Sequence, residues 1–210
     1  VAAYVQTLTY GFTLDDMPLI TDNTLIDSLR NVPRLFTLYF GNYKPGTDFP
    51  HTLYRPLTAV TFATDFALYK LNASGFHLTN MALHAVASLL LFLMVRDVFG
   101  HLAMAAIAGV LFAVHPIHTE AVSGVIGRAD VMSLLGCLLC VWCYFRAMAV
   151  VGTDRAGVRE RWAWTGASLA GYLVAMFAKE GGVVAPAMIL CAELVLPASL
   201  WGQLVAFGLF

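Results

Sequence analysis

The chain has 210 residues, of which 60% are hydrophobic and only 12% are charged, and its formal net charge is -1. Soluble globular domains carry roughly 25% charged residues, so this composition, together with a mean hydropathy of +0.75, indicates a membrane protein. The 12 lysines and arginines are spread along the chain. This excludes a nucleic-acid-binding protein, because such proteins need a concentrated basic face.

The first third of the chain, residues 1–75, is predicted to contain the end of one membrane span and a large polar loop. The stretch VAAYV at residues 1–5 has the composition of the last turn of a span, and no methionine precedes it, so we expect a fragment. Within the loop, residues 23–40 and 55–71 place apolar side chains at helical intervals, the pattern of helices that lie along a membrane surface. Three turn-forming residues separate these two helices: Pro45, Gly46 and Pro50.

Residues 76–210 are predicted to form a bundle of membrane helices. A spanning helix needs about 20 mostly apolar residues. Five stretches approach this length, and a sixth begins near residue 200 and is truncated. The five predicted spans are 77–95, 101–115, 131–151, 162–179 and 182–200.

The distribution of arginines predicts the orientation of this bundle. If the spans alternate in direction, one side of the membrane carries four of them: Arg96, Arg155, Arg159 and Arg161. The positive-inside rule assigns that side to the cytoplasm. The loop of residues 1–75 then shares the opposite, lumenal side with residues 115–130 and 179–180, so the remaining charged groups converge there.

Two adjacent carboxylates, Asp15 and Asp16, follow the first apolar segment. Like charges at this separation can raise the pKa of one carboxyl group, which would provide a general base near the membrane surface. A turn that precedes Pro18 explains the same residues. The pattern alone leaves both interpretations open.

Two cations, Arg55 and Lys179, are candidates for binding a phosphate group, and a carboxylate, Glu180, follows the second. Arg55 begins the second loop helix, and Lys179 and Glu180 lie at the lumenal end of a predicted span. A guanidinium group can bind a phosphate through two parallel hydrogen bonds and stays charged. The alternatives are that Arg55 reaches ordinary lipid headgroups and that Lys179 and Glu180 form an interfacial pair of small energy.

Polar residues also occur inside the first complete span. His77, Asn80 and His84 are spaced by three and four residues and therefore share one helical face. Polar residues in spans usually face the bundle interior and form hydrogen bonds there. We expect this of His84, and we expect His77 and Asn80, nearer the lumenal end, to contact a ligand. A metal-binding pair is the alternative.

The densest group of polar residues lies between two apolar spans, at residues 115–130: His115, His118, Glu120, Arg128 and Asp130. A zinc site is one interpretation, but the zincin signature separates its two histidines by four residues and places a glutamate between them. Here the histidines are three residues apart, Pro116 follows the first, and the glutamate lies beyond both. We therefore expect no metal, and predict a wall of hydrogen-bonding groups in which Asp130 suits the positive end of a helix dipole.

The chain resembles the amino-terminal membrane half of the transmembrane and tetratricopeptide-repeat O-mannosyltransferases in five motifs: GFTLDDMPLI, YRPLT, FHLTNMALHAVASLLLF, LFAVHPIHTEAVSGVIGRADVMSLLGCLL and AKEGGVVAPAMIL. The resemblance runs from Val1 to about Leu196 and is most specific at residues 115–130. It implies an all-α fold of the GT-C glycosyltransferase type, with a large first lumenal loop that holds an acidic motif. No repeat of about 34 residues occurs in the chain, so we expect a fragment without the carboxy-terminal repeats, inactive by itself.

The resemblance also implies an activity, namely transfer of mannose from dolichyl phosphate mannose to Ser or Thr hydroxyls of secretory-pathway proteins. The expected location is the endoplasmic reticulum membrane, with multiple spans, and the acceptors in animal members are cadherin-type domains. The expected partners are therefore membrane lipid, the lipid-linked donor and a lumenal acceptor protein. No cofactor is expected, since the lipid-linked sugar is the substrate.

Residue roles follow from the resemblance and from the transition state of glycosyl transfer, which requires a base on the face of the sugar opposite the leaving group. The expected base is Asp15 or Asp16, and the resemblance favours Asp15. The residues expected to bind the donor phosphate or sugar are Arg55, His77, Asn80, His115, His118, Glu120, Arg128, Asp130, Lys179 and Glu180.

Two other classes of protein compete with the transferase. A transporter would also place ionisable residues in a helix bundle, but it should show inverted repeats with matched broken helices, and the sequence shows no such symmetry. A non-catalytic membrane scaffold would keep the spans and would have no use for the carboxylates.

Overall fold

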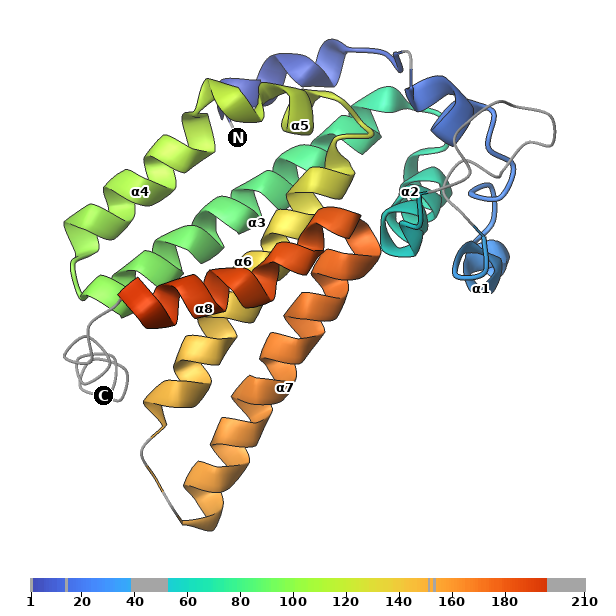
Figure 1. Ribbon diagram of the computed structural model, residues 1–210. Coiled ribbons are helices and arrows are strands. Elements are labelled where there is room, and N and C mark those ends of the chain that lie inside the picture. The colour runs from blue at the N-terminus through green and yellow to red at the C-terminus, as the bar shows by residue number, and fades with distance from the viewer. Residues whose placement is uncertain (1, 14, 39–52, 151, 153, 196–210) are drawn as a thin grey trace.

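The computed structural model describes residues 2–13, 15–38, 53–150, 152 and 154–195, and in these residues the secondary structure is helical with no β-strand (Figure 1). The all-α prediction is therefore confirmed. The α-helices are α1 (Val32–Leu35), α2 (Pro56–Tyr69), α3 (Ala73–Phe99), α4 (Leu102–Val114), α5 (Thr119–Ser123), α6 (Arg128–Ala149), α7 (Arg155–Ala178) and α8 (Ala185–Val195). Short 3-10 or π segments join them: η1 (Ala2–Thr9), η2 (Met17–Thr21), η3 (Leu29–Asn31), η4 (Pro116–His118) and η5 (Glu180–Val184).

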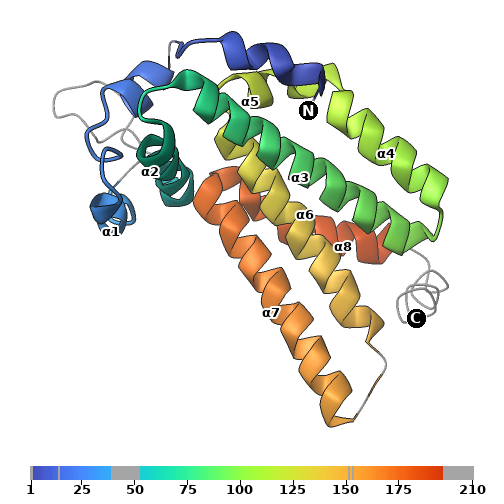
Figure 2. The same cartoon turned by 180° about the vertical axis from the view of Figure 1, so that it is seen from behind.

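In the bundle of long helices α3 packs beside α4 and α6 beside α7, and the two members of each pair run in opposite directions (Figures 1 and 2). Helices α3 and α6 also pack together, and they run in the same direction. At one end of this bundle the first residues of α3 and α6 lie near the last residues of α7, together with η1, α2 and α5, while α4 ends alongside the middle of α3. We call this the loop end. The four arginines used to predict the orientation belong to the last turn of α3 and to the first turns of α7, at the opposite end of the bundle.

Within the described residues two helices are long and apolar enough to cross a membrane: an 18-residue window has a mean hydropathy of 1.9 in α3 and 1.8 in α6. A third candidate is α4 together with Pro116–Ser123, which are bent by 44° at the break. Pro116 accounts for the break, because proline cannot donate a backbone hydrogen bond inside a helix.

The remaining predicted spans correspond to helices of different extent. Helix α7 covers the predicted span 162–179 except for its last residue, but it begins at Arg155, so its first turns are charged. It is not among the described helices that meet the composition required of a span. The predicted span 182–200 is described as η5 followed by α8, and its remainder, like the span predicted from residue 200, lies outside the described residues.

The predicted loop helix at 55–71 is present as α2, whereas the one at 23–40 is not a continuous helix. Its described part forms short turns, because polar side chains satisfy the backbone locally. The Asn23 side chain donates to Leu19 O and accepts from Leu25 N, and the Ser28 hydroxyl accepts from Arg30 N.

The loop segment nevertheless packs tightly against the bundle. Leu19, Ile20, Ile26 and Leu35 are buried in one apolar cluster. The other buried members come from α2, from the start of α3 and from the turn before α6: Ala59, Phe62, Ala63, Phe76 and Val125. Burial of this apolar surface fixes the segment around Asp15 relative to the helix ends.

Glycines allow α6 and α7 to approach each other closely. A Cβ atom at Gly136 would lie 2.5 Å from the backbone nitrogen of Ala175, and a Cβ at Gly171 would lie 2.7 Å from that of Cys140. Small residues at helix contacts permit such backbone approach in membrane bundles. Since Lys179 follows α7 and Asp130 lies on α6, this contact also sets the geometry of the loop end.

We predict that Gly136→Ala lowers the stability of the protein by about 1–3 kcal/mol, because the added methyl group must push two backbones apart. Thermal unfolding in detergent measures the effect. The matched control is Gly166→Ala on α7, where an added Cβ meets nothing within 4 Å; this variant should be neutral or gain up to about 1 kcal/mol from helix propensity. Equal stability of the two variants would contradict the close contact.

Candidate functional site

A cavity of about 490 Å³ lies at the loop end. Its volume falls within the range of roughly 300–1,000 Å³ of small-molecule sites. Five predicted site residues line it: Asp15, Arg55, Glu120, Asp130 and Lys179. Apolar side chains complete the wall: Leu19, Leu53, Ile117 and Ile126. Four segments that are far apart in the sequence thus contribute to one cavity.

Arg55, the residue before α2, forms a bidentate ion pair with Glu180. Its Nε lies 3.0 Å from Glu180 Oε2 and its Nη2 lies 2.5 Å from Oε1. The hydrogen bond from Arg55 lowers the pKa of the Glu180 carboxyl group, so this group is ionised at neutral pH. We predicted a cation at this position to bind phosphate. The structure shows that this cation, Arg55, already has a carboxylate partner in Glu180.

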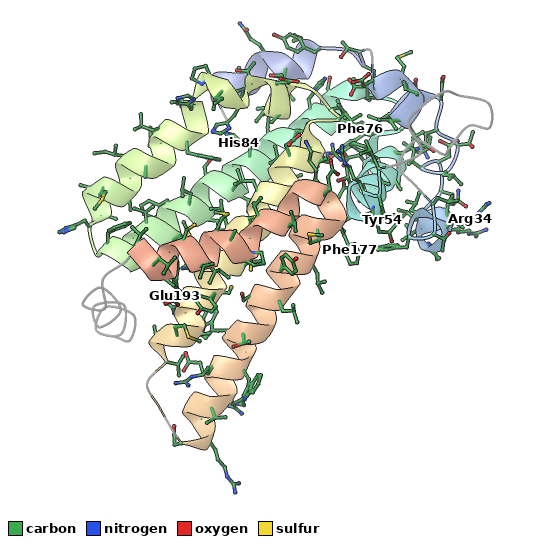
Figure 3. The ribbon with its side chains drawn as sticks, in the orientation of Figure 1. Arg34, Tyr54, Phe76, His84, Phe177 and Glu193 are labelled. Atoms are coloured by element: carbon green, nitrogen blue, oxygen red, sulfur yellow. The ribbon has the colours of Figure 1, made fainter. Side chains whose placement is uncertain are left out.

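The contact between α2 and the end of α7 has two further components. The Thr58 hydroxyl donates to the carbonyl oxygen of Ala178 at 2.9 Å. The rings of Tyr54 and Phe177 meet edge to face with centroids 6.3 Å apart (Figure 3). These contacts fix the backbone position of Arg55 relative to Lys179.

Lys179 forms the second ion pair of the cavity. Its Nζ lies 2.6 Å from Asp130 Oδ1, and the Asp130 side chain is half exposed. Because Asp130 lies in the first turn of α6, it also interacts favourably with the helix dipole, as predicted.

The two adjacent aspartates have different environments. Asp16 is buried, and its carboxylate accepts hydrogen bonds from Thr13 N at 3.0 Å and from Ile126 N at 3.1 Å. Asp16 thus connects the loop segment to the turn before α6. Asp15 is exposed, lines the cavity and has no hydrogen-bond or ion-pair partner among the described residues.

The residues from His115 to Glu120 separate into two groups. The Glu120 side chain lines the cavity and has no partner among the residues described. The two histidines are not part of the cavity wall. His118 packs against Phe112 and His84 with ring centroids at 4.3 and 5.3 Å, and His115 Nδ1 accepts a hydrogen bond from Ile117 N. His84 itself is buried and contacts Ala113 O at 3.2 Å, which confirms its predicted packing role.

Arg128 is fully buried, so its predicted contact with a phosphate is not possible in this structure. Its Nη2 lies 2.6 Å from Asp65 Oδ2 and also donates to Phe76 O at 2.9 Å, while its Nε donates to Asn80 Oδ1 at 2.7 Å. The guanidinium carbon also lies 4.7 Å from the centroid of the Phe62 ring. Arg128 is therefore a structural residue.

Asn80 and His77, which we expected to contact a ligand, are also buried beneath the cavity wall. The Asn80 amide donates to Gly124 O at 2.9 Å and Val125 O at 3.3 Å, and so holds the turn between α5 and α6. His77 is 1% exposed and meets the ring of Tyr10 edge to face. Neither side chain lines the cavity. Sequence spacing identified the helical face, but it could not show that Tyr10 and the turn between α5 and α6 cover this face.

Asp65 is the important residue that sequence analysis missed. It is 3% exposed, pairs with Arg128, and accepts a hydrogen bond from the Thr79 hydroxyl at 2.8 Å. A signal for Asp65 was present in the sequence: a carboxylate surrounded by apolar residues in TFATDFALY requires a buried partner.

The described part of the chain contains no group of three or more His, Cys, Asp or Glu side chains placed to hold a metal ion.

Curated proteins from several animals are similar to this chain. It is 38% identical to Protein O-mannosyl-transferase TMTC3 of Homo sapiens over 184 residues, which are 87% of this chain and 19% of the relative. It is 36% identical to Protein O-mannosyl-transferase tmtc2 of Xenopus laevis over 86% of this chain and 21% of the relative. For Protein O-mannosyl-transferase Tmtc2 of Drosophila melanogaster the identity is 33%, over 95% of this chain and 21% of the relative.

The chain spans about a fifth of the length of these relatives. No family model matches it. No solved structure matches it.

The buried pair of Asp65 and Arg128 gives a prediction about stability. Asp65→Asn and Arg128→Gln should each destabilise the protein by about 3–5 kcal/mol, because either change leaves a buried charge without its partner. The double variant should be more stable than the sum of the two single changes predicts, since it buries no charge. A double-mutant cycle of thermal or denaturant unfolding measures the coupling, and strict additivity would contradict the pairing.

Proposed function

The chain belongs to the TMTC family of protein O-mannosyl-transferases, and on this basis we propose that its loop end forms the donor site of a GT-C glycosyltransferase. The donor is dolichyl phosphate mannose, and the acceptor is a Ser or Thr hydroxyl of a protein in the lumen of the endoplasmic reticulum. The observation that carries the proposal is the cavity in which Asp15, a carboxylate with no partner among the described residues, converges with two cations, Arg55 and Lys179.

The reaction requires a base and a stabilised leaving group. In the proposed step the acceptor oxygen attacks C1 of mannose on the face opposite the phosphate, and the hydroxyl proton passes to the Asp15 carboxylate. The bond between C1 and the phosphate oxygen breaks, and its electron pair stays on the phosphate. The configuration at C1 is therefore inverted.

Asp15 suits the role of base better than Asp16. The Asp16 carboxylate already accepts two backbone hydrogen bonds, from Thr13 and Ile126, whereas Asp15 faces the cavity. Glu120 is a second carboxylate of the same cavity that no described residue pairs with, and it can accept hydrogen bonds from sugar hydroxyls. The histidines at positions 115 and 118 have no role in this proposal, since neither lines the cavity.

The cations stabilise charge on the leaving phosphate. The donor is a phosphate diester with one negative charge, and the departing dolichyl phosphate develops a second. Fixed cations directed at developing charge lower the barrier. Arg55 and Lys179 are the basic residues of the described cavity wall. Arg128, the alternative to Lys179 in our expectation, is fully buried and has no part in this proposal.

The base is tested by Asp15→Asn in the full-length membrane protein. We expect mannose transfer to fall by about 10²–10⁴-fold, the usual contribution of a positioned base, while folding is retained because the side chain is exposed. Transfer of labelled mannose from dolichyl phosphate mannose to a Ser/Thr acceptor is the measurement. Asp27→Asn, at another exposed aspartate of the same segment, is the control and should retain activity. An active Asp15→Asn variant would disprove the assignment.

The dependence on metal ions provides a second test. Because the two cations of the cavity supply positive charge to the phosphate, we expect transfer to persist in EDTA. The measurement is the same transfer assay with and without chelator. Loss of activity in EDTA and its recovery with a divalent ion would require a different account of leaving-group stabilisation.

A further inference from the structure

The proposed phosphate site contains two cations, and both are paired with carboxylates of the protein. Arg55 binds Glu180, and Lys179 binds Asp130. A phosphate group that enters the cavity must therefore compete with carboxylates for the same nitrogen atoms.

Resting on the proposed function, we infer that Glu180 and Asp130 are exchangeable counter-ions: the donor phosphate displaces them from Arg55 and Lys179 when it binds, and they return when the phosphate leaves. The ligand class is a lipid-linked phosphate. Binding is then an exchange of ion pairs rather than the filling of a vacant cationic site.

The exposure of the paired side chains supports this exchange. The Glu180 and Asp130 side chains are 57% and 52% exposed, whereas those of Arg55 and Lys179 are 12% and 28% exposed. In each pair the cation is fixed by the surrounding protein and the carboxylate lies toward solvent. A displaced carboxylate can therefore rotate into water without a desolvation cost.

The fold does not depend on the ion pair that would be opened. Thr58 still donates to Ala178 O, and Tyr54 still packs on Phe177, when the Glu180 carboxylate moves away. Because the Glu180 side chain is 57% exposed, screening by solvent also limits what this pair contributes to stability. The end of α7 thus remains attached to α2 during the exchange.

The third acid–base pair at the loop end has the opposite properties. The Arg128 and Asp65 side chains are 0% and 4% exposed, so separation of this pair would leave two buried charges. It cannot exchange with a ligand. Burial therefore divides the three pairs into one structural pair and two that a phosphate can open.

Exchange of the carboxylates for the phosphate also favours the transition state and product release over binding of the donor. A resident carboxylate weakens binding of the singly charged donor, and the phosphate competes better as its second charge develops. Interactions that strengthen toward the transition state are the ones that accelerate a reaction. After transfer, return of Glu180 and Asp130 to the cations assists release of dolichyl phosphate.

The test is direct binding of dolichyl phosphate to the full-length protein in lipid nanodiscs, measured for wild type, Glu180→Gln and Asp130→Asn. We expect each variant to bind about two- to fivefold more tightly than wild type, the factor that removal of an exposed ion pair provides. The control is Glu160→Gln at the far end of α7, where the carboxylate accepts from Trp164, and its affinity should equal that of wild type.

Weaker or unchanged binding in both cavity variants would overturn the inference, since it would mean that the carboxylates position the cations or do not compete. The two variants change the partners of different cations, Glu180 for Arg55 and Asp130 for Lys179. The test therefore remains valid if one variant fails to fold. The proposed function is tested separately by mannose transfer. Tighter binding without transfer would reject the function alone, and transfer with weaker binding would reject the exchange alone.

Discussion

The loop end depends on one buried guanidinium group. Arg128 brings together α2 through Asp65, α3 through Phe76 and Asn80, and the start of α6 on which it lies. Because an unpaired buried charge is very costly, these elements can adopt this arrangement only together. Asn80 extends the network to the turn between α5 and α6, which forms part of the cavity wall.

The cavity above this network combines rigid and adjustable parts. The backbone that carries its side chains is fixed by Asp16, by the apolar cluster around Phe62 and Phe76, and by the close contact of α6 with α7. The adjustable part consists of the paired side chains, in which the carboxylates of Glu180 and Asp130 are more exposed than the cations that they bind. A site that must bind a phosphate, transfer a sugar and release a lipid phosphate needs both properties, since positioning requires rigidity and release requires that ion pairs reform.

Sequence analysis located the site but did not assign every role within it. Charge and alternation of spans placed Asp15, Arg55, Glu120, Asp130 and Lys179 at one end of the bundle, and the structure brings all five to one cavity. The burial of particular polar residues was not predicted. His77, Asn80 and Arg128, which we expected to contact a ligand, are covered by other parts of the chain. Asp65, which pairs with Arg128, was not selected as a site residue.

The amino-acid sequence by itself determined the all-α class, the apolar helices, the break at Pro116 and the family, because composition, helical periodicity and ordered motifs are properties of the chain alone. Only the tertiary structure decided which charges are structural and which are accessible to a ligand. The physical reason is that the free energy of a charged group depends on its exposure and its partner. Both are set by residues more than 40 positions away, as for Asp65 with Arg128 and for Arg55 with Glu180.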